Sequence, residues 1–180
     1  EQDIGRQLLQ ETAAYAETSV CRRKMLMHYF GETYEQDNCG NCDNCVRPTT
    51  KIEGEKQLVV ALTSILAIKE NFRTDYVIDF VMGRETNEIV AHRHNQLEEF
   101  GSGEDFGEKI WNPLIRQALI AGYIKKEVEN YGLLKVTSEG KKFIKKPKSF
   151  MIVEDKEFNE DDEIVVDQEG GTCALDPTLN

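Results

Sequence analysis

Apolar residues recur every three or four positions along most of the chain, which is the spacing of amphipathic helices. The first such stretch runs from Ile4 to Ala16. A second extends to Phe30, with Thr18 or Ser19 as its N-cap and Gly31 at its end. The two stretches predict a helical hairpin. In it, the second helix would pack against the first through Met25, Leu26, Tyr29 and Phe30.

A polar, breaker-containing segment at 49–56 separates this hairpin from a second group of helices. Helices are predicted over 57–72, 76–81 and 106–121. A further helix is predicted to begin after Thr86, which would be its N-cap. Two short strands then follow, at 123–129 and 133–136, joined by a turn at 130–132. Helices followed by a hairpin are the layout of a winged helix-turn-helix. The predicted fold class is therefore mainly α with a small β-hairpin.

Composition and charge separate the C-terminal segment from the rest. The formal net charge is −11, but residues 150–180 hold 10 of the 33 acidic residues and, of the 22 basic ones, only Lys156. The remaining 149 residues are close to charge balance, so the whole-chain charge does not argue against nucleic acid. Because the chain begins at Glu1 within a predicted helix, we expect it to be part of a longer protein. No apolar run approaches the roughly 18 residues of a membrane span.

Four of the five cysteines lie within one short window, and the last three form a C-x-x-C-x-x-C run. Four thiolates around one centre are what a closed tetrahedral zinc site requires. The run lies in a polar segment without an apolar face, which disfavours ordinary core cysteines, whereas an iron–sulfur cluster remains an alternative. An odd cysteine count with this spacing favours a reducing compartment over a disulfide scaffold. The candidate ligands are Cys21, Cys39, Cys42 and Cys45.

These boundaries predict four regions. Residues 1–48 form a helical-hairpin zinc-binding subdomain with four cysteine ligands, 49–56 a linker, 57–147 a winged-helix domain and 148–180 an acidic, flexible tail. In the tail, the apolar patches at 150–153 and 164–166 are candidates to add strands to a sheet edge, and Cys173 is expected to be a free thiol. Zinc ligation would supply much of the folding free energy of the small subdomain, on the order of 10 kcal/mol or more.

Several motifs resemble the C-terminal region of RecQ-type DNA helicases, in its bacterial form. The likeness covers residues 1–146 and includes Cys-Arg-Arg at 21–23 with Tyr-Phe-Gly-Glu at 29–32, Cys-Gly-Asn-Cys-Asp-Asn-Cys at 39–45 and Trp-x-x-Leu-Ile-Arg-Gln at 111–117. The resemblance implies structural zinc on the four cysteines and a winged helix of the RQC type. It also implies a parent enzyme that unwinds DNA with 3′→5′ polarity in repair and recombination.

The resemblance places ATP and Mg²⁺ in motor domains upstream of this region. Residues 1–180 contain no G-x-x-x-x-G-K-[S/T] loop, so this region alone is not expected to hydrolyse ATP. The implied partners are DNA and those motor domains, with no membrane. The implied location is the bacterial cytoplasm with its nucleoid, or the nucleus if the source is eukaryotic.

The resemblance also suggests that Tyr131, at the tip of the predicted hairpin, stacks on the terminal base pair of a DNA fork. Base stacking of this kind is worth roughly 1–3 kcal/mol. Further candidates for phosphate contacts are Arg84, Asn87, His92 and Arg93 in the helix-turn-helix part, and Lys125 and Lys135 beside the tip. Each of these polar residues is also compatible with an ordinary solvated face. His28, His92 and His94 do not have metal-ligand spacing relative to the cysteines.

Two other functions fit parts of the pattern. A winged-helix transcription regulator would read bases with its third helix and would show strong sequence preference. A protein-interaction module would use the winged helix as a docking platform and would have no measurable DNA affinity at low salt.

Overall fold

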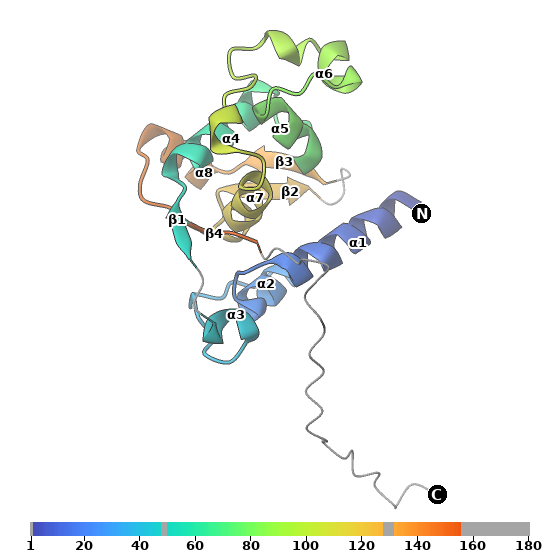
Figure 1. Ribbon diagram of the computed structural model, residues 1–180. Coiled ribbons are helices and arrows are strands. Elements are labelled where there is room, and N and C mark those ends of the chain that lie inside the picture. Colours follow the sequence, from blue (N-terminus) through green and yellow to red (C-terminus); the bar gives the residue numbers. More distant parts are fainter. Residues whose placement is uncertain (1, 48–49, 128–131, 156–180) are drawn as a thin grey trace, which may run out of the picture.

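The computed structural model describes residues 2–47, 50–127 and 132–155. The N-terminal part consists of α1 (Gln2–Glu17), α2 (Arg22–Tyr29) and the short α3 (Asp43–Val46), which lie together in Figure 1. The predicted first helix is confirmed, and Gly31 ends the second with a positive φ of 77°. No helix in the described part of the chain is long and apolar enough to cross a membrane.

The second helix begins later than its predicted caps. Its N-cap is Cys21, because Thr18 and Ser19 are buried in the turn that precedes it. The Thr18 hydroxyl accepts a hydrogen bond from the Val20 amide at 3.2 Å, so it closes that turn instead of capping α2.

The predicted packing of the second helix against the first is not confirmed. No residue of α2 is buried: Met25 is half-buried, and Leu26 is 46% exposed. Tyr29 is 60% and Phe30 69% exposed, and the two rings contact each other edge to face.

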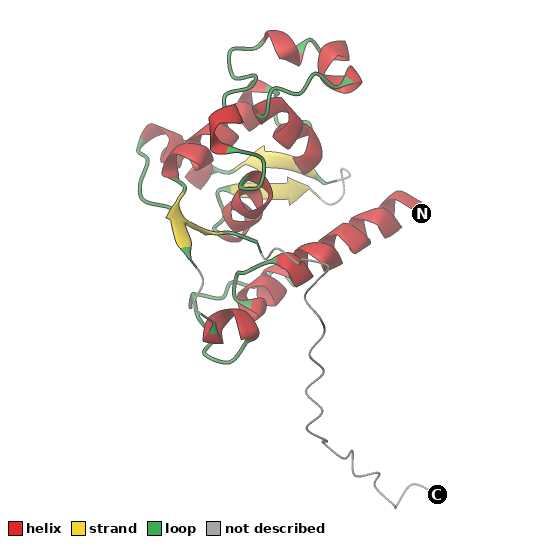
Figure 2. Cartoon of the chain, viewed as in Figure 1, coloured by secondary structure: helices red, strands yellow, loops and turns green. Residues whose placement is uncertain are grey.

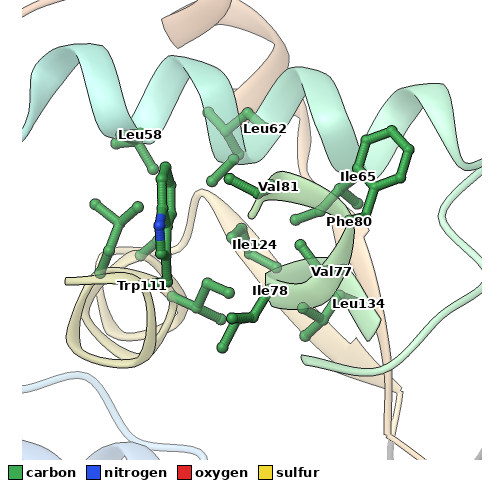
Figure 3. Close-up of a cluster of buried hydrophobic side chains, with 14 of the residues drawn as sticks. Leu58, Leu62, Ile65, Val77, Ile78, Phe80, Val81, Trp111, Ile124 and Leu134 are labelled. Carbon is green, nitrogen blue, oxygen red and sulfur yellow. The ribbon is translucent and has the colours of Figure 1, made fainter. Parts of the chain in front are cut away.

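The winged-helix part is built around one continuous core. Helices α4 (Glu55–Ala67), α5 (Thr74–Val81), α7 (Trp111–Ile120) and α8 (Ser138–Lys145) enclose one face of the hairpin β2–β3 (Ile124–Glu127, Leu133–Val136). Between α5 and α7 lie α6 (Asn87–Ala91) and the 3₁₀ turns η1 (His94–Gln96) and η2 (Glu104–Phe106). Figure 2 shows this mainly helical composition. The fully buried side chains include Leu58, Leu62, Ile65, Phe80, Trp111, Ile124 and Leu134 (Figure 3).

Two predicted helices are shorter than their apolar patterns suggest. The first ends at Ala67 because Lys69 and Glu70 adopt positive φ angles, 62° and 54°. The segment from Phe106 splits into η2 and α7, with Gly107 at φ 77° between them. The loop before this break approaches the core closely: a Cβ on Gly103 would lie 2.3 Å from the Trp111 ring.

Strands β1 (Lys51–Glu53) and β4 (Met151–Val153) pair antiparallel, with Ile52 opposite Ile152. Strand β1 lies in the expected linker, and β4 lies in the first residues of the expected tail. The Gly54 amide donates to the Phe150 carbonyl at 2.8 Å, and the Glu53 carboxylate accepts from the Phe150 amide at 2.8 Å. We infer that the winged-helix unit extends from β1 to β4. The tail beyond Asp155 lies outside the described residues.

Replacement of Ile152 by alanine tests this pairing. Ile152 is fully buried and belongs to the core cluster, so the loss should lower the free energy of unfolding by about 2–5 kcal/mol in chemical denaturation. Met151 is 46% exposed, and M151A is the matched control with little expected change. Equal, small effects of both substitutions would contradict a structural role for β4.

Candidate functional site

The four predicted cysteine ligands come together at one point. Their Sγ atoms all lie within 4.8 Å of one another, and all four thiols are free. Cys21 is the N-cap of α2, Cys39 lies in the loop before α3, Cys42 is the N-cap of α3 and Cys45 lies within α3. Gly40 adopts φ 75°, which allows the sharp turn between the first two cysteines of the run.

The donor set fits a single zinc ion. Zinc–sulfur bonds of about 2.3 Å in a tetrahedron place the sulfurs about 3.8 Å apart, which fits within the observed limit of 4.8 Å. In a [4Fe–4S] cluster each cysteine binds a different iron, and in a [2Fe–2S] cluster the four cysteines are divided between two irons, so the four sulfurs are spread more widely than around one ion. The geometry therefore favours one ion over a cluster, and all four coordination positions would be filled by protein. Such a closed site is structural and has no position for substrate.

The local backbone already favours thiolate at one ligand. Amides of Asn41 and Cys42 donate to the Cys39 sulfur and lower its pKa to about 6. Burial raises the pKa of Cys45 to about 12, although it accepts a bond from the Cys39 amide at 3.3 Å. Four thiols cannot all ionise side by side without a cation, and a bound dication would reverse the unfavourable interactions.

A polar clamp around the cluster was missed by the sequence reasoning. Asn44 is buried and donates to the carbonyls of Thr18 at 2.7 Å and Val20 at 2.8 Å, which ties α3 to the turn before α2. Arg22 makes two bonds of 3.0 Å to the Asp43 carboxylate. Arg22 is therefore engaged within the subdomain.

This N-terminal unit has no hydrophobic core of its own among the described residues. All members of the buried apolar cluster lie between residues 58 and 152. The buried residues before 48 are Cys21, Thr18, Ser19 and Asn44. Metal ligation and the polar clamp thus replace apolar burial here, as in other small metal-stabilised units.

The metal-binding unit rests on α7 and the hairpin. The His28 Nε2 atom lies 3.2 Å from the Leu119 carbonyl oxygen, and Ile120 lines a small groove with residues 24, 28 and 32–34. Lys126 of β2 forms an ion pair with Glu11 of α1 at 3.1 Å. His28 thus contacts α7.

A second set of contacts covers α7 from β4. The Gln117 side chain donates to the Val153 carbonyl at 2.7 Å and accepts from the Val153 amide at 3.0 Å. Arg116 forms an ion pair with Asp155 at 2.7 Å, with both side chains largely buried. Arg116 is therefore held in a structural ion pair. Together the two sets cover the second half of α7, the helix directly before the hairpin, whereas Asn112 in its first turn is exposed.

The candidate DNA contacts in the helix-turn-helix part gather around α6, near one end of the molecule (Figure 1). Asn87 is the exposed first residue of α6, and Arg93 is exposed with φ 57°. His92 is exposed and packs edge to face on Phe72, with ring centroids 5.0 Å apart. Arg84 is engaged by two carboxylates, Asp79 at 3.2 Å and Glu108 at 2.5 Å.

The candidate DNA contacts on the β2–β3 hairpin form a separate group. Lys125 and Lys135 are opposite each other across β2 and β3, on the face turned away from the core. Glu127 lies between them, 3.9 Å from Lys125 and 3.2 Å from Lys135. Tyr131 lies outside the described residues, so its role stays a prediction.

Comparison with known proteins covers both parts of the chain. A family model described as RecQ zinc-binding matches residues 1–46, and one described as RQC domain matches residues 48–161. Two similar relatives, both named ATP-dependent DNA helicase RecQ, come from Pasteurella multocida and Haemophilus influenzae. They are 32% identical over 138 residues and 29% identical over 146 residues. These matches cover 76% and 81% of this chain but only 22% and 23% of the relatives.

Eukaryotic proteins are also similar. The ATP-dependent helicase SGS1 of Saccharomyces cerevisiae is 31% identical over 126 residues, which are 64% of this chain and 9% of the yeast protein. The family match supports structural zinc at the cysteine cluster, in agreement with its geometry.

Replacement of Cys42 by serine tests the structural role of this cluster. The variant should lose stoichiometric zinc and the ordered N-terminal unit, because no apolar core among its described residues can compensate. Elemental analysis and circular dichroism would measure both effects. C173S is the control and should keep one zinc per chain. A C42S variant that lacks metal yet remains soluble and fully folded would contradict the structural role.

Proposed function

The chain belongs to the RecQ family through its zinc-binding and RQC regions, and from this premise we propose that it is the DNA-binding accessory region of a 3′→5′ ATP-dependent DNA helicase. It spans less than a quarter of the two bacterial relatives described above. ATP hydrolysis with Mg²⁺ belongs, in this proposal, to motor domains in the remainder of the parent protein. The parent would act in DNA repair and recombination, in the bacterial cytoplasm or in a eukaryotic nucleus.

The covering of α7 is the observation that carries the proposal. In winged-helix regulators the corresponding third helix enters the major groove and reads base edges. Here the second half of α7 is held by His28, Val153 and Asp155, so base readout by that part of the helix would require both sets of contacts to open, and Asn112 in the first turn is left exposed. This arrangement favours binding without strong sequence preference, which suits a helicase, over the regulator alternative.

Backbone contacts would come from two groups of residues. Asn87, His92 and Arg93 are exposed at the two ends of α6, and Lys125 and the half-buried Lys135 lie on the outer face of the hairpin, where they share Glu127. Phosphate contacts by such residues set the position of a protein on DNA and carry no sequence information. Arg84 is the weakest member, because a phosphate would have to compete with its two carboxylate partners.

In this proposal the zinc-binding unit has a mechanical role. It fixes α1 and α2 against α7 and β2, as the Glu11–Lys126 and His28–Leu119 contacts indicate. Motor domains preceding α1 would therefore move the winged helix as one body. DNA bound to the winged helix would then keep a fixed position relative to the hairpin during unwinding.

Binding measurements with the zinc-loaded chain distinguish the candidate functions. Fluorescence anisotropy should give higher affinity for forked or overhanging DNA than for blunt duplex, with little change when the base sequence is altered at constant structure. Strong dependence on base sequence would instead support a regulator. Absence of binding to every DNA at low salt would support a protein-docking module.

Replacement of Tyr131 by alanine tests the role of the hairpin tip. In the full-length parent protein, Y131A should slow unwinding several-fold while ATP hydrolysis stays nearly unchanged, because the loss of one stacking contact is worth roughly 1–3 kcal/mol. Strand-displacement and phosphate-release assays measure the two rates. Unwinding at the parental rate would contradict the proposed stacking role of Tyr131.

A further inference from the structure

A strongly basic surface lies on α8 and the residues after it. Residues 138–149 contain five lysines and one acidic residue, Glu139. All five lysines are exposed. We call them the α8 lysine cluster: Lys141, Lys142, Lys145, Lys146 and Lys148.

The cluster is largely free of neutralising carboxylates. Lys142 contacts Glu139 at 2.6 Å, whereas the other four lysines form no ion pair within the described part of the chain. Cations elsewhere are more often paired, as Lys126 is with Glu11 and Arg116 is with Asp155. In a chain with net charge −11, this leaves a local positive surface.

The cluster borders an open groove with an aromatic floor. The groove has a volume of about 180 Å³ and is lined by Tyr123, Glu139, Lys142, Phe143, Lys146 and Lys148. The Lys148 ammonium lies 5.8 Å from the centre of the Tyr123 ring. Lys142 and Lys146 are four residues apart and border the same groove. Cations around a groove of this kind match a flexible anionic polymer better than a single small anion.

The helix that carries the lysines is firmly held. Its cap Thr137 accepts a hydrogen bond from the Gly140 amide at 3.1 Å, and Phe143 is only 3% exposed. A Cβ on Gly140 would lie 2.3 Å from the Tyr123 carbonyl oxygen, so α8 lies directly against the chain entering β2. The lysines are therefore displayed from a rigid frame.

The α8 lysine cluster is separate from the DNA contacts proposed above. Figure 1 shows α8 on the side of the winged-helix unit opposite to the end of β2 and the start of β3. Helix α6 lies at a third position, at the top of that view. A DNA strand that reached α8 as well as the hairpin would therefore extend across the domain.

We propose that the α8 lysine cluster binds the sugar–phosphate backbone of DNA and forms a second anchoring surface of this region. The inference rests on the proposed function, because it supposes that the chain binds DNA. Lysine ammonium groups act as point charges on phosphates and leave bases unread. The surface therefore adds affinity and salt dependence without adding sequence preference.

The variant K146Q/K148Q, which removes two lysines that line the groove, tests the proposal in the zinc-loaded 180-residue chain. Both lysines are exposed and form no ion pair among the described residues, so the fold should be unaffected. The slope of log Kd against log salt for a DNA duplex with a single-stranded overhang should fall by about 1.8, at about 0.9 per lost phosphate contact. R23Q/R47Q is the matched control, because it removes two exposed positive charges from the metal-binding unit. Its slope should stay near that of the parent chain.

The outcomes separate this inference from the proposed function. A parent chain that binds DNA, with an unchanged slope in K146Q/K148Q, overturns the lysine surface and leaves the proposed function standing. Equal losses in the two double variants also overturn it, because they would reflect net charge alone. A parent chain that binds no DNA at low salt overturns both.

A second variant of the same surface should raise the DNA affinity instead of lowering it. E139Q removes the one carboxylate in the groove and releases Lys142. DNA affinity should therefore rise several-fold at low salt. A decrease would contradict phosphate binding at this groove.

Discussion

The attraction between one dication and four sulfur ligands is the constraint on which the N-terminal quarter of this chain depends. No apolar core exists among its described residues, and Cys21 is the one buried apolar residue there. Zinc binding in such small units contributes free energies of roughly 10–16 kcal/mol, comparable to the whole stability of a domain. The polar clamp of Asn44 and Arg22 then sets the direction in which α2 and α3 leave the cluster.

That constraint extends into the winged-helix unit. Because α2 is fixed by Cys21 at its start, His28 is presented to the Leu119 carbonyl, and α7 is covered from one side. Strand β4 covers α7 from another side through Gln117 and Arg116. The second half of the helix before the hairpin, in a fold often used for base readout, thus serves here as an internal support. In the proposed function, DNA contacts fall to surfaces around it, including α6, the outer face of the hairpin and α8.

Local sequence patterns predicted most of the fold and the metal site. The cysteine spacing encodes its own geometry, because a C-x-x-C turn brings its sulfurs together whatever surrounds it. Helical periodicity located α1, α4, α5 and α7, although the positive φ angles at Lys69 and Glu70 shortened α4 in a way that its apolar pattern does not reveal. The apolar patch at 150–153 is a candidate strand in the sequence and contains β4, but its partner β1 lies about 100 residues away and has only three residues, too few for a periodic signal. Likewise, the sequence alone made Arg84 a candidate for phosphate contact, whereas the structure places it in an ion pair with Glu108, which is 24 residues away in the chain.

X-ray absorption spectroscopy of the purified chain at the zinc edge tests the central claim most directly. The account predicts one zinc per chain with a single shell of four sulfur atoms at about 2.3 Å. Iron in place of zinc with a metal–metal distance, or a shell in which nitrogen or oxygen replaces one of the sulfurs, would contradict it.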